Sequence, residues 1–163
     1  MLPVIVVLVG LPGSGKSTWL RQRGQRSISS DDIRGMLADD ETIQTIHADV
    51  FAVMRDLVRR RIRLQRPLTY VDATHLNPRE RRPYIKMAEL YECTTEALFF
   101  DVPLAVCKQR NLARPRVVPE EAMDVMAARL VPPSEAEGFA RVTIIGERTS
   151  TTPPAQESTG PSR

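Results

Sequence analysis

The chain has little cysteine, little lysine, few aromatic residues and no long hydrophobic run. Its two cysteines, Cys93 and Cys107, do not have the spacing of a disulfide framework or a metal site, so we expect reduced thiols. The longest apolar run, residues 4–9, is far too short to span a membrane, and no basic segment precedes it as a secretory signal would require. We therefore expect a cytoplasmic protein with no membrane attachment.

Lysine occurs only at Lys16, Lys86 and Lys108, so the net charge of +3 depends almost entirely on arginine. The planar guanidinium group suits phosphate recognition. Amino-acid usage also varies in this way among ordinary proteins. The charge balance alone therefore does not separate a nucleic-acid-binding protein from other classes.

Residues 1–146 and residues 147–163 differ in composition. The chain as a whole is 42% hydrophobic and 26% charged, which is ordinary for a globular protein. The last segment is rich in Ser, Thr, Pro and Gly and has almost nothing to bury. We expect one domain over residues 1–146 and a disordered tail over residues 147–163.

Strands and helices are predicted to alternate along the chain. Residues 4–9 form a continuous apolar run that is typical of a strand buried on both faces of a parallel sheet. Further strands are predicted at 26–29, 68–71, 95–100 and 141–145, and helices from 16 onward and at 31–37, 41–65, 78–91, 103–114 and 119–130. This alternation favours a three-layer α/β fold in which helices flank a parallel sheet.

A glycine-rich segment that matches the P-loop pattern G-x-x-x-x-G-K-[ST] follows the first predicted strand. In such a loop the backbone N–H groups surround the β-phosphate, Lys16 reaches the β- and γ-oxygens, and Ser17 can ligate Mg²⁺. We expect ATP and Mg²⁺ to bind here. The predicted nucleotide-binding residues of the segment are Gly10, Pro12, Gly13, Ser14, Gly15, Lys16, Ser17 and Thr18.

A second group of candidates, Asp31, Asp32 and Arg34, follows the second predicted strand. Ligands gather at the carboxyl ends of parallel strands, so a carboxylate here lies within reach of the γ-phosphate. Asp31 could accept a proton from an acceptor hydroxyl, while Arg34 could hold an acceptor phosphate. Alternatively, the two aspartates cap a helix and Arg34 is a surface residue.

The third predicted strand leads into another carboxylate, Asp72. Asp72 could help to place Mg²⁺ or orient the acceptor. It could also cap a turn before Pro78.

Two arginines, Arg110 and Arg114, are four residues apart before a loop bounded by prolines. On one helix face they would form a helical lid whose guanidinium groups offset the charge on a transferring phosphoryl group. The alternative is a solvated helix end with favourable C-terminal cations.

The long predicted helix carries basic residues on one side, namely Arg55, Arg59, Arg63 and Arg66. Such a face is usually solvated, and no aromatic residues interleave with these arginines to stack bases. His47, on the same helix, has no partner at zinc-ligand spacing and is interpreted as a surface residue.

Four sequence blocks together resemble the polynucleotide 5′-kinase domain of phage and bacterial type, within the P-loop kinases. The likeness extends to about Ile145. The blocks are Gly10-Leu11-Pro12-Gly13-Ser14-Gly15-Lys16-Ser17-Thr18-Trp19, Asp31-Asp32-Ile33-Arg34, Asp72-Ala73-Thr74-His75-Leu76-Asn77-Pro78 with Arg81-Arg82, and Phe100-Asp101-Val102-Pro103 with Arg110-Asn111 and Arg114.

The resemblance implies an adenylate-kinase-like fold and transfer of the γ-phosphoryl group of ATP to a 5′-hydroxyl of DNA or RNA. It makes Asp31 the general base, Arg34 a ligand of an acceptor phosphate, and Arg110 and Arg114 ligands of ATP. It matches Asp72 to a required carboxylate. His75 departs from the family, where Asn is usual, so an acceptor contact by that amide is not expected.

Two other functions fit the same motifs. A small-molecule kinase would act on a metabolite or antibiotic hydroxyl, and it would present an enclosed cavity with hydroxyl-directed amides rather than an open, arginine-lined channel. A nucleotide-gated binding module would bind ATP and label no acceptor.

Overall fold

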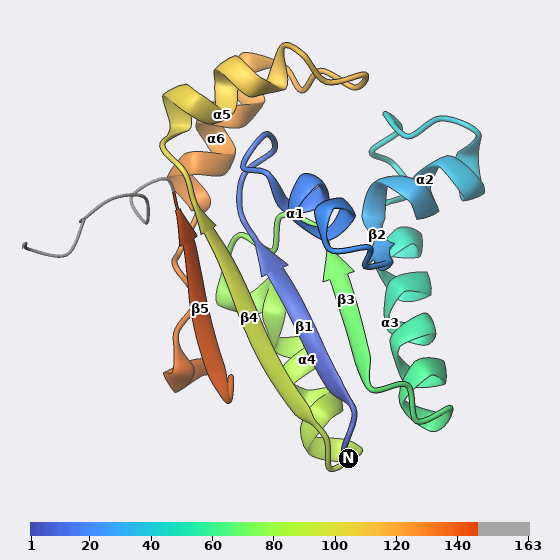
Figure 1. The fold of residues 1–163 in the computed structure, drawn as a ribbon. Helices are drawn as coiled ribbons and strands as arrows, with labels where there is room; N and C mark the ends of the chain where they lie inside the picture. Colours follow the sequence, from blue (N-terminus) through green and yellow to red (C-terminus); the bar gives the residue numbers. More distant parts are fainter. Residues whose placement is uncertain (147–163) are drawn as a thin grey trace, which may run out of the picture.

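A computed structural model describes residues 1–146 of the chain, and the predicted disordered tail lies outside the described residues. Within residues 1–146, five parallel strands form one sheet in the order β2-β3-β1-β4-β5 (Figure 1). Their bounds are β1 Val4–Val9, β2 Ser27–Ser29, β3 Leu68–Asp72, β4 Thr94–Asp101 and β5 Arg141–Gly146. The predicted three-layer α/β fold with a parallel sheet is confirmed.

The register of the central strands brings the candidate residues to one edge of the sheet. β1 pairs with β3 so that Leu8 lies opposite Asp72, and β2 pairs with β3 so that Ser29 lies opposite Asp72. The carboxyl ends of β1, β2 and β3 therefore meet, and the segments that follow them share this edge.

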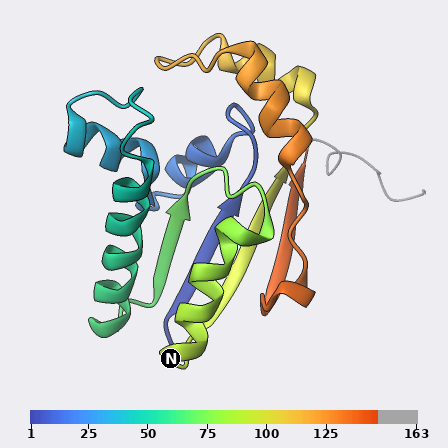
Figure 2. The same ribbon diagram turned by 180° about the vertical axis from the view of Figure 1, so that it is seen from behind.

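In the described part of the chain, six α-helices and one 3₁₀-helix accompany the sheet. Their bounds are α1 Lys16–Gln22, α2 Ser30–Ala38, α3 His47–Arg63, α4 Pro78–Leu90, α5 Leu104–Asn111, α6 Glu120–Arg129 and η1 Glu135–Glu137. Helices α3 and α4 pack on one face of the sheet, where Val50, Met54 and Tyr84 meet Ile5 and Val7 (Figure 2). Helix α1 packs on the other face through Trp19 and Leu20.

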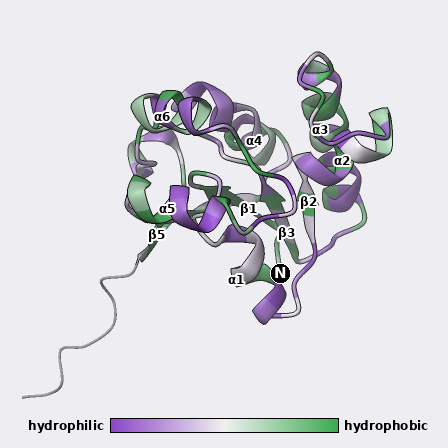
Figure 3. Cartoon of the chain, turned by 90° about the horizontal axis from the view of Figure 1, so that it is seen from above, coloured by the Kyte–Doolittle hydropathy of each residue, from purple (hydrophilic) through white to green (hydrophobic). Residues whose placement is uncertain are grey.

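Helices α5 and α6 stand above the carboxyl edge as a lid, across from α2 and α3 (Figure 3). A small core that contains Leu11, Cys107, Val118 and Met123 packs this lid against the P-loop. The predicted helical lid is therefore joined to the phosphate-binding loop by apolar contacts.

The predicted helix over residues 41–65 is too long at its N-terminal end. The structure starts α3 at His47, because Asp40 holds the preceding segment in a turn. Its Oδ1 accepts hydrogen bonds from the Thr42 backbone N–H at 2.8 Å and the Thr42 hydroxyl at 2.6 Å. An aspartate that bonds the backbone in this way competes with helix formation.

No helix within residues 1–146 combines the length and the apolar character needed to cross a bilayer.

Candidate active site

The P-loop joins β1 to α1 and adopts a backbone that only glycine accommodates at its turns. Gly13 and Gly15 have φ values of 81° and 98°. A Cβ atom on Gly13 would also meet the Cys107 carbonyl oxygen at 2.5 Å. The Ser14 hydroxyl is buried and has no hydrogen-bond partner among the described residues. A tight loop with an unpartnered buried hydroxyl fits a bound phosphate.

Lys16 lies inside this loop. Its ammonium group donates hydrogen bonds to the carbonyl oxygens of Gly10 at 2.8 Å and Leu11 at 3.0 Å. Burial lowers the pKa of Lys16, whereas the nearby Asp72 opposes that shift. The charge therefore sits in a poorly solvated position, where its attraction to phosphate oxygens is strong.

Ser17 and Asp72 together offer oxygen donors for a magnesium ion. The Ser17 hydroxyl donates to Asp72 Oδ2 at 3.1 Å, across from α1 to the end of β3. Burial raises the pKa of Asp72, and Lys16 opposes that shift. No cluster of three or more His, Cys, Asp or Glu side chains suitable for a metal exists in the described part of the chain. One hydroxyl and one carboxylate fit Mg²⁺, which takes its other ligands from water and phosphates.

Asp31 does not cap α2. The cap is Ser29, whose hydroxyl oxygen accepts a hydrogen bond from the Asp32 backbone N–H at 3.3 Å. The interpretation of Asp31 and Asp32 as capping side chains is therefore wrong. The carboxylate of Asp31 is therefore free to interact with side chains from other segments.

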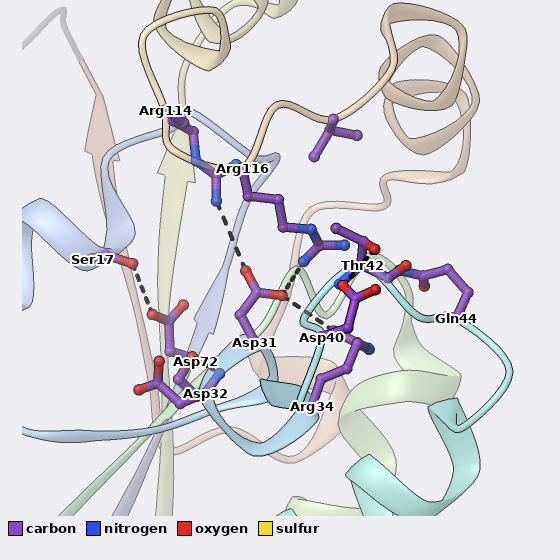
Figure 4. A network of polar contacts seen from close by, with 12 residues as sticks. Ser17, Asp31, Asp32, Arg34, Asp40, Thr42, Gln44, Asp72, Arg114 and Arg116 are labelled. Atoms are coloured by element: carbon purple, nitrogen blue, oxygen red, sulfur yellow. Dashed lines mark hydrogen bonds and ion pairs between the residues drawn. The ribbon is translucent and has the colours of Figure 1, made fainter. Parts of the chain in front are cut away.

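Three guanidinium groups surround the Asp31 carboxylate (Figure 4). Arg34, one turn further along α2, donates to Oδ1 at 3.2 Å, and Arg116 pairs with the same oxygen. Arg114 approaches Oδ2 at 3.9 Å. The Arg34 side chain is 5% exposed, so it is a buried partner of Asp31 and not a surface residue. Its burial lowers the pKa of Arg34, and Asp31 opposes that shift.

The lid presents its arginines from a loop as well as from a helix. Arg110 is on α5, but α5 ends at Asn111 and Arg114 lies in the following turn, so the predicted shared helix face is wrong. The Asn111 amide closes this loop, since it donates to the Val118 carbonyl at 2.8 Å and accepts from the Val118 N–H at 3.0 Å.

Arg116 was not among the predicted site residues. The signal was present in the sequence Arg114-Pro115-Arg116, which places a further guanidinium in the proline-bounded loop. Asn111 stood in a family block, but its role in closing the loop follows only from the fold.

One cavity of about 710 Å³ collects most of these side chains. Asp31, Arg34, Asp72, Arg110 and Arg114 all line it, together with Pro12, Gly13, Gly15, Lys16, Ser17 and Thr18 of the P-loop segment. Gly10 and Ser14 shape the loop without lining the cavity. Among the described residues, five arginines and only one side-chain amide, that of Gln44, face this space. It is therefore a strongly cationic site.

His75 is a structural residue that does not line the cavity. It is 1% exposed and has a φ of 47°, a left-handed conformation that Asn and His adopt more readily than most residues. Its Nδ1 bonds the Leu8 carbonyl oxygen at 2.6 Å, and its ring meets Tyr84 edge-on. Burial lowers the pKa of His75 to about 4.

This pKa predicts an acid-sensitive fold. An unfolded His75 with the ordinary pKa of 6.5 takes up a proton as the pH falls below that value, whereas the folded side chain stays neutral down to about 4. Between pH 7 and pH 5 the free energy of unfolding should therefore fall by about 2 kcal/mol from this group. Urea unfolding of wild type and His75→Asn at both pH values measures the effect. The free energy of unfolding of the variant should fall by about 2 kcal/mol less than that of wild type between these pH values. Equal decreases in the two proteins would contradict a buried, neutral His75.

A family model described as an AAA domain matches residues 5–133. The chain belongs to the AAA domain family. No curated protein has a sequence similar enough to count as a relative of this AAA domain chain.

Solved structures share the fold. A putative kinase from Chloroflexus aurantiacus is 12% identical with a TM-score of 0.69, over 90% of this chain and 89% of that one. A chain of the Pnkp1/Rnl/Hen1 RNA repair complex is 20% identical with a TM-score of 0.62, over 79% of this chain. This AAA domain chain spans only 44% of that protein's chain. The Mycobacterium tuberculosis APS kinase CysC, solved with AMPPNP and APS, is 18% identical with a TM-score of 0.55, over 91% of each chain.

These neighbours establish a P-loop kinase fold for the AAA domain. They include a chain of an RNA repair complex and an APS kinase, so the shared fold does not by itself fix a reaction or an acceptor.

Proposed function

We propose that this protein is a polynucleotide 5′-hydroxyl kinase, which transfers the γ-phosphoryl group of ATP to the 5′-hydroxyl end of DNA or RNA. One observation carries the proposal. The Asp31 carboxylate shares a single cavity with the P-loop lysine and is held there by arginines from α2 and from the lid. A base, a phosphate cradle and cationic groups for both substrates thus border the same space.

Each side chain then has a role in positioning or charge. The P-loop amides and Lys16 hold the donor phosphates, and Arg110 and Arg114 approach from the lid to offset the charge on the transferring group. When bound at Ser17 and Asp72, Mg²⁺ supplies further neutralisation of phosphate charge. Asp31 accepts the proton of the attacking hydroxyl, and Arg34 fixes Asp31 and contacts an acceptor phosphate.

A nucleic-acid end suits this cavity better than a small neutral metabolite. Five arginines and one amide line it, which favours several phosphates over a set of sugar hydroxyls. The structural neighbour from an RNA repair complex supports the same reading. A small-molecule kinase is the second candidate, because a gluconokinase from Sinorhizobium meliloti has the same fold with a TM-score of 0.54.

The proposal predicts which acceptor takes the label. Incubation with γ-labelled ATP and Mg²⁺ should transfer label to 5′-hydroxyl oligonucleotides and leave 5′-phosphorylated oligonucleotides, gluconate and adenosine phosphosulfate unlabelled. Lys16→Met should abolish transfer, because the donor phosphates lose their main cationic ligand. Label on a metabolite alone would support the second candidate, and ATP binding without any labelled acceptor would support a nucleotide-gated binding module.

A further inference from the structure

A second hollow of about 430 Å³ lies between α3 and α4, on the face of the sheet opposite α1. Arg55 and Arg59 of α3 and Arg82 and Lys86 of α4 line it. Apolar side chains also line it, namely Pro83, Met87, Leu90 and Tyr91. We call this hollow the α3–α4 groove.

The four cations of the α3–α4 groove are not neutralised by its lining. No carboxylate of the described residues lines the groove. Within residues 1–146, none of the four forms an ion pair. The nearby carboxylate of Asp56 is bound to Arg60 at 2.8 Å and attracts Arg59 only through space. Four like charges in one hollow repel one another, so the groove is complementary to a polyanion.

A single ridge of α3 connects this groove with the active-site cavity. His47, Phe51, Arg55 and Arg59 follow one another at four-residue intervals, so their side chains lie along one side of the helix. His47 and Phe51 line the same cavity as Asp31, and their ring centroids are 4.5 Å apart. Arg55 and Arg59 line the groove. The ridge therefore leads from the active-site cavity to the cations of the α3–α4 groove.

We propose that this ridge and the α3–α4 groove bind the acceptor strand beyond its 5′ end. The inference rests on the proposed kinase function and specifies its substrate as a single-stranded polynucleotide. A base near the 5′ end stacks against the His47–Phe51 pair, and the following phosphates contact Arg55, Arg59, Arg82 and Lys86. Aromatic platforms beside a basic groove are the usual means of holding single strands.

The length of the ridge determines how many nucleotides it can contact. Residues 47 to 59 span about 18 Å at 1.5 Å per residue. At about 3.4 Å per stacked nucleotide, this distance corresponds to about five nucleotides. Tyr91, directly after α4, supplies a further aromatic surface in the α3–α4 groove.

The test measures how KM and salt dependence change with acceptor length. Wild type is assayed with 5′-hydroxyl DNA and RNA oligonucleotides of about two to about ten nucleotides. We expect KM to fall with length up to about six nucleotides and then to level off. In R55Q/R59Q, KM for the longest acceptors should rise about tenfold while kcat stays within about twofold.

Salt dependence provides a second readout, and a matched variant provides the control. Loss of two phosphate contacts should flatten the slope of log affinity against log salt by about 1.4 for a single strand. R23Q/R26Q removes the same charge from the segment between α1 and β2, and α1 packs on the opposite face of the sheet, so this variant should keep the wild-type length dependence and slope.

Two kinds of result would overturn the inference. The binding of the strand along the ridge and the α3–α4 groove is wrong if wild type phosphorylates oligonucleotides with a KM that does not depend on their length. It is also wrong if KM rises as much in the control variant as in R55Q/R59Q. In both cases the kinase function stands. If no oligonucleotide of any length is phosphorylated, the proposed function fails and the assignment of an acceptor strand fails with it.

Discussion

Replacement of Asp31 by Asn is expected to lower kcat for 5′-hydroxyl phosphorylation by about 10²- to 10⁴-fold, the range that a positioned general base contributes. The amide keeps the size of the side chain but cannot accept the hydroxyl proton. Lys16, Ser17 and the lid arginines remain in place, so the affinity for ATP should change less than about threefold. Single-turnover kinetics and a separate ATP titration measure the two quantities.

Asp32→Asn is the matched control, because Asp32 is the exposed neighbour of Asp31 on the same helix and does not line the cavity. It should keep kcat within about twofold. Asp31→Asn also leaves the buried Arg34 without its carboxylate partner, so a loss of about 1–3 kcal/mol in stability is expected. The activities of wild type and the variants are therefore compared at a temperature well below the Tm of the least stable variant.

Two outcomes would contradict the role of Asp31. If the variant keeps nearly full kcat, Asp31 is not the general base, and Asp72 is the other carboxylate that lines the cavity. A loss of ATP affinity that equals the loss of kcat would make Asp31 a positioning residue for Arg114, which it approaches at 3.9 Å.

The sheet and the phosphate loop could be read from the sequence because local patterns determine them. The β-branched run of β1 is apolar on both faces, which is typical of a central parallel strand. The P-loop glycines at Gly13 and Gly15 are required by positive φ values, so the motif and the backbone agree. The carboxyl-edge rule then placed Asp31 and Asp72 in the same cavity without any knowledge of distances.

The sequence could not show the features that depend on distant parts of the chain. Arg116 meets Asp31 across 85 positions, and no local pattern predicts such a pair. Asp40 holds Thr42 in a local turn and α3 starts only at His47, although the apolar periodicity begins earlier. The arginines of α3 looked like a solvated face because Tyr91 and Lys86 join them only through the packing of α4 beside α3.

Arg81→Met is expected to destabilise the fold by about 3–5 kcal/mol, which lowers Tm by roughly 10 °C. Arg81 is 0% exposed, and its guanidinium donates two bonds of 2.9 Å to Glu137 and one of 2.9 Å each to the carbonyl oxygens of His75 and Val131. It therefore ties the loop after β3 to the segment that follows α6. Met fills the space but leaves these acceptors without donors. Arg79→Met, at an exposed arginine of the same helix, should change stability by less than about 0.5 kcal/mol.

A double-mutant cycle separates the buried charge from the packing. Once Arg81 is gone, the carboxylate of Glu137, which is 13% exposed, is the main source of the penalty. Glu137→Gln in the Arg81→Met background should therefore recover about 1–2 kcal/mol, whereas Glu137→Gln alone should destabilise. If the loss of stability in the double variant equals the sum of the losses in the two single variants, the two side chains contribute independently. Val131 lies two residues after the end of the lid helix α6, so its bond to Arg81 anchors the lid on the loop after β3. Arg81→Met removes this anchor, and the KM of the variant for ATP should therefore also rise.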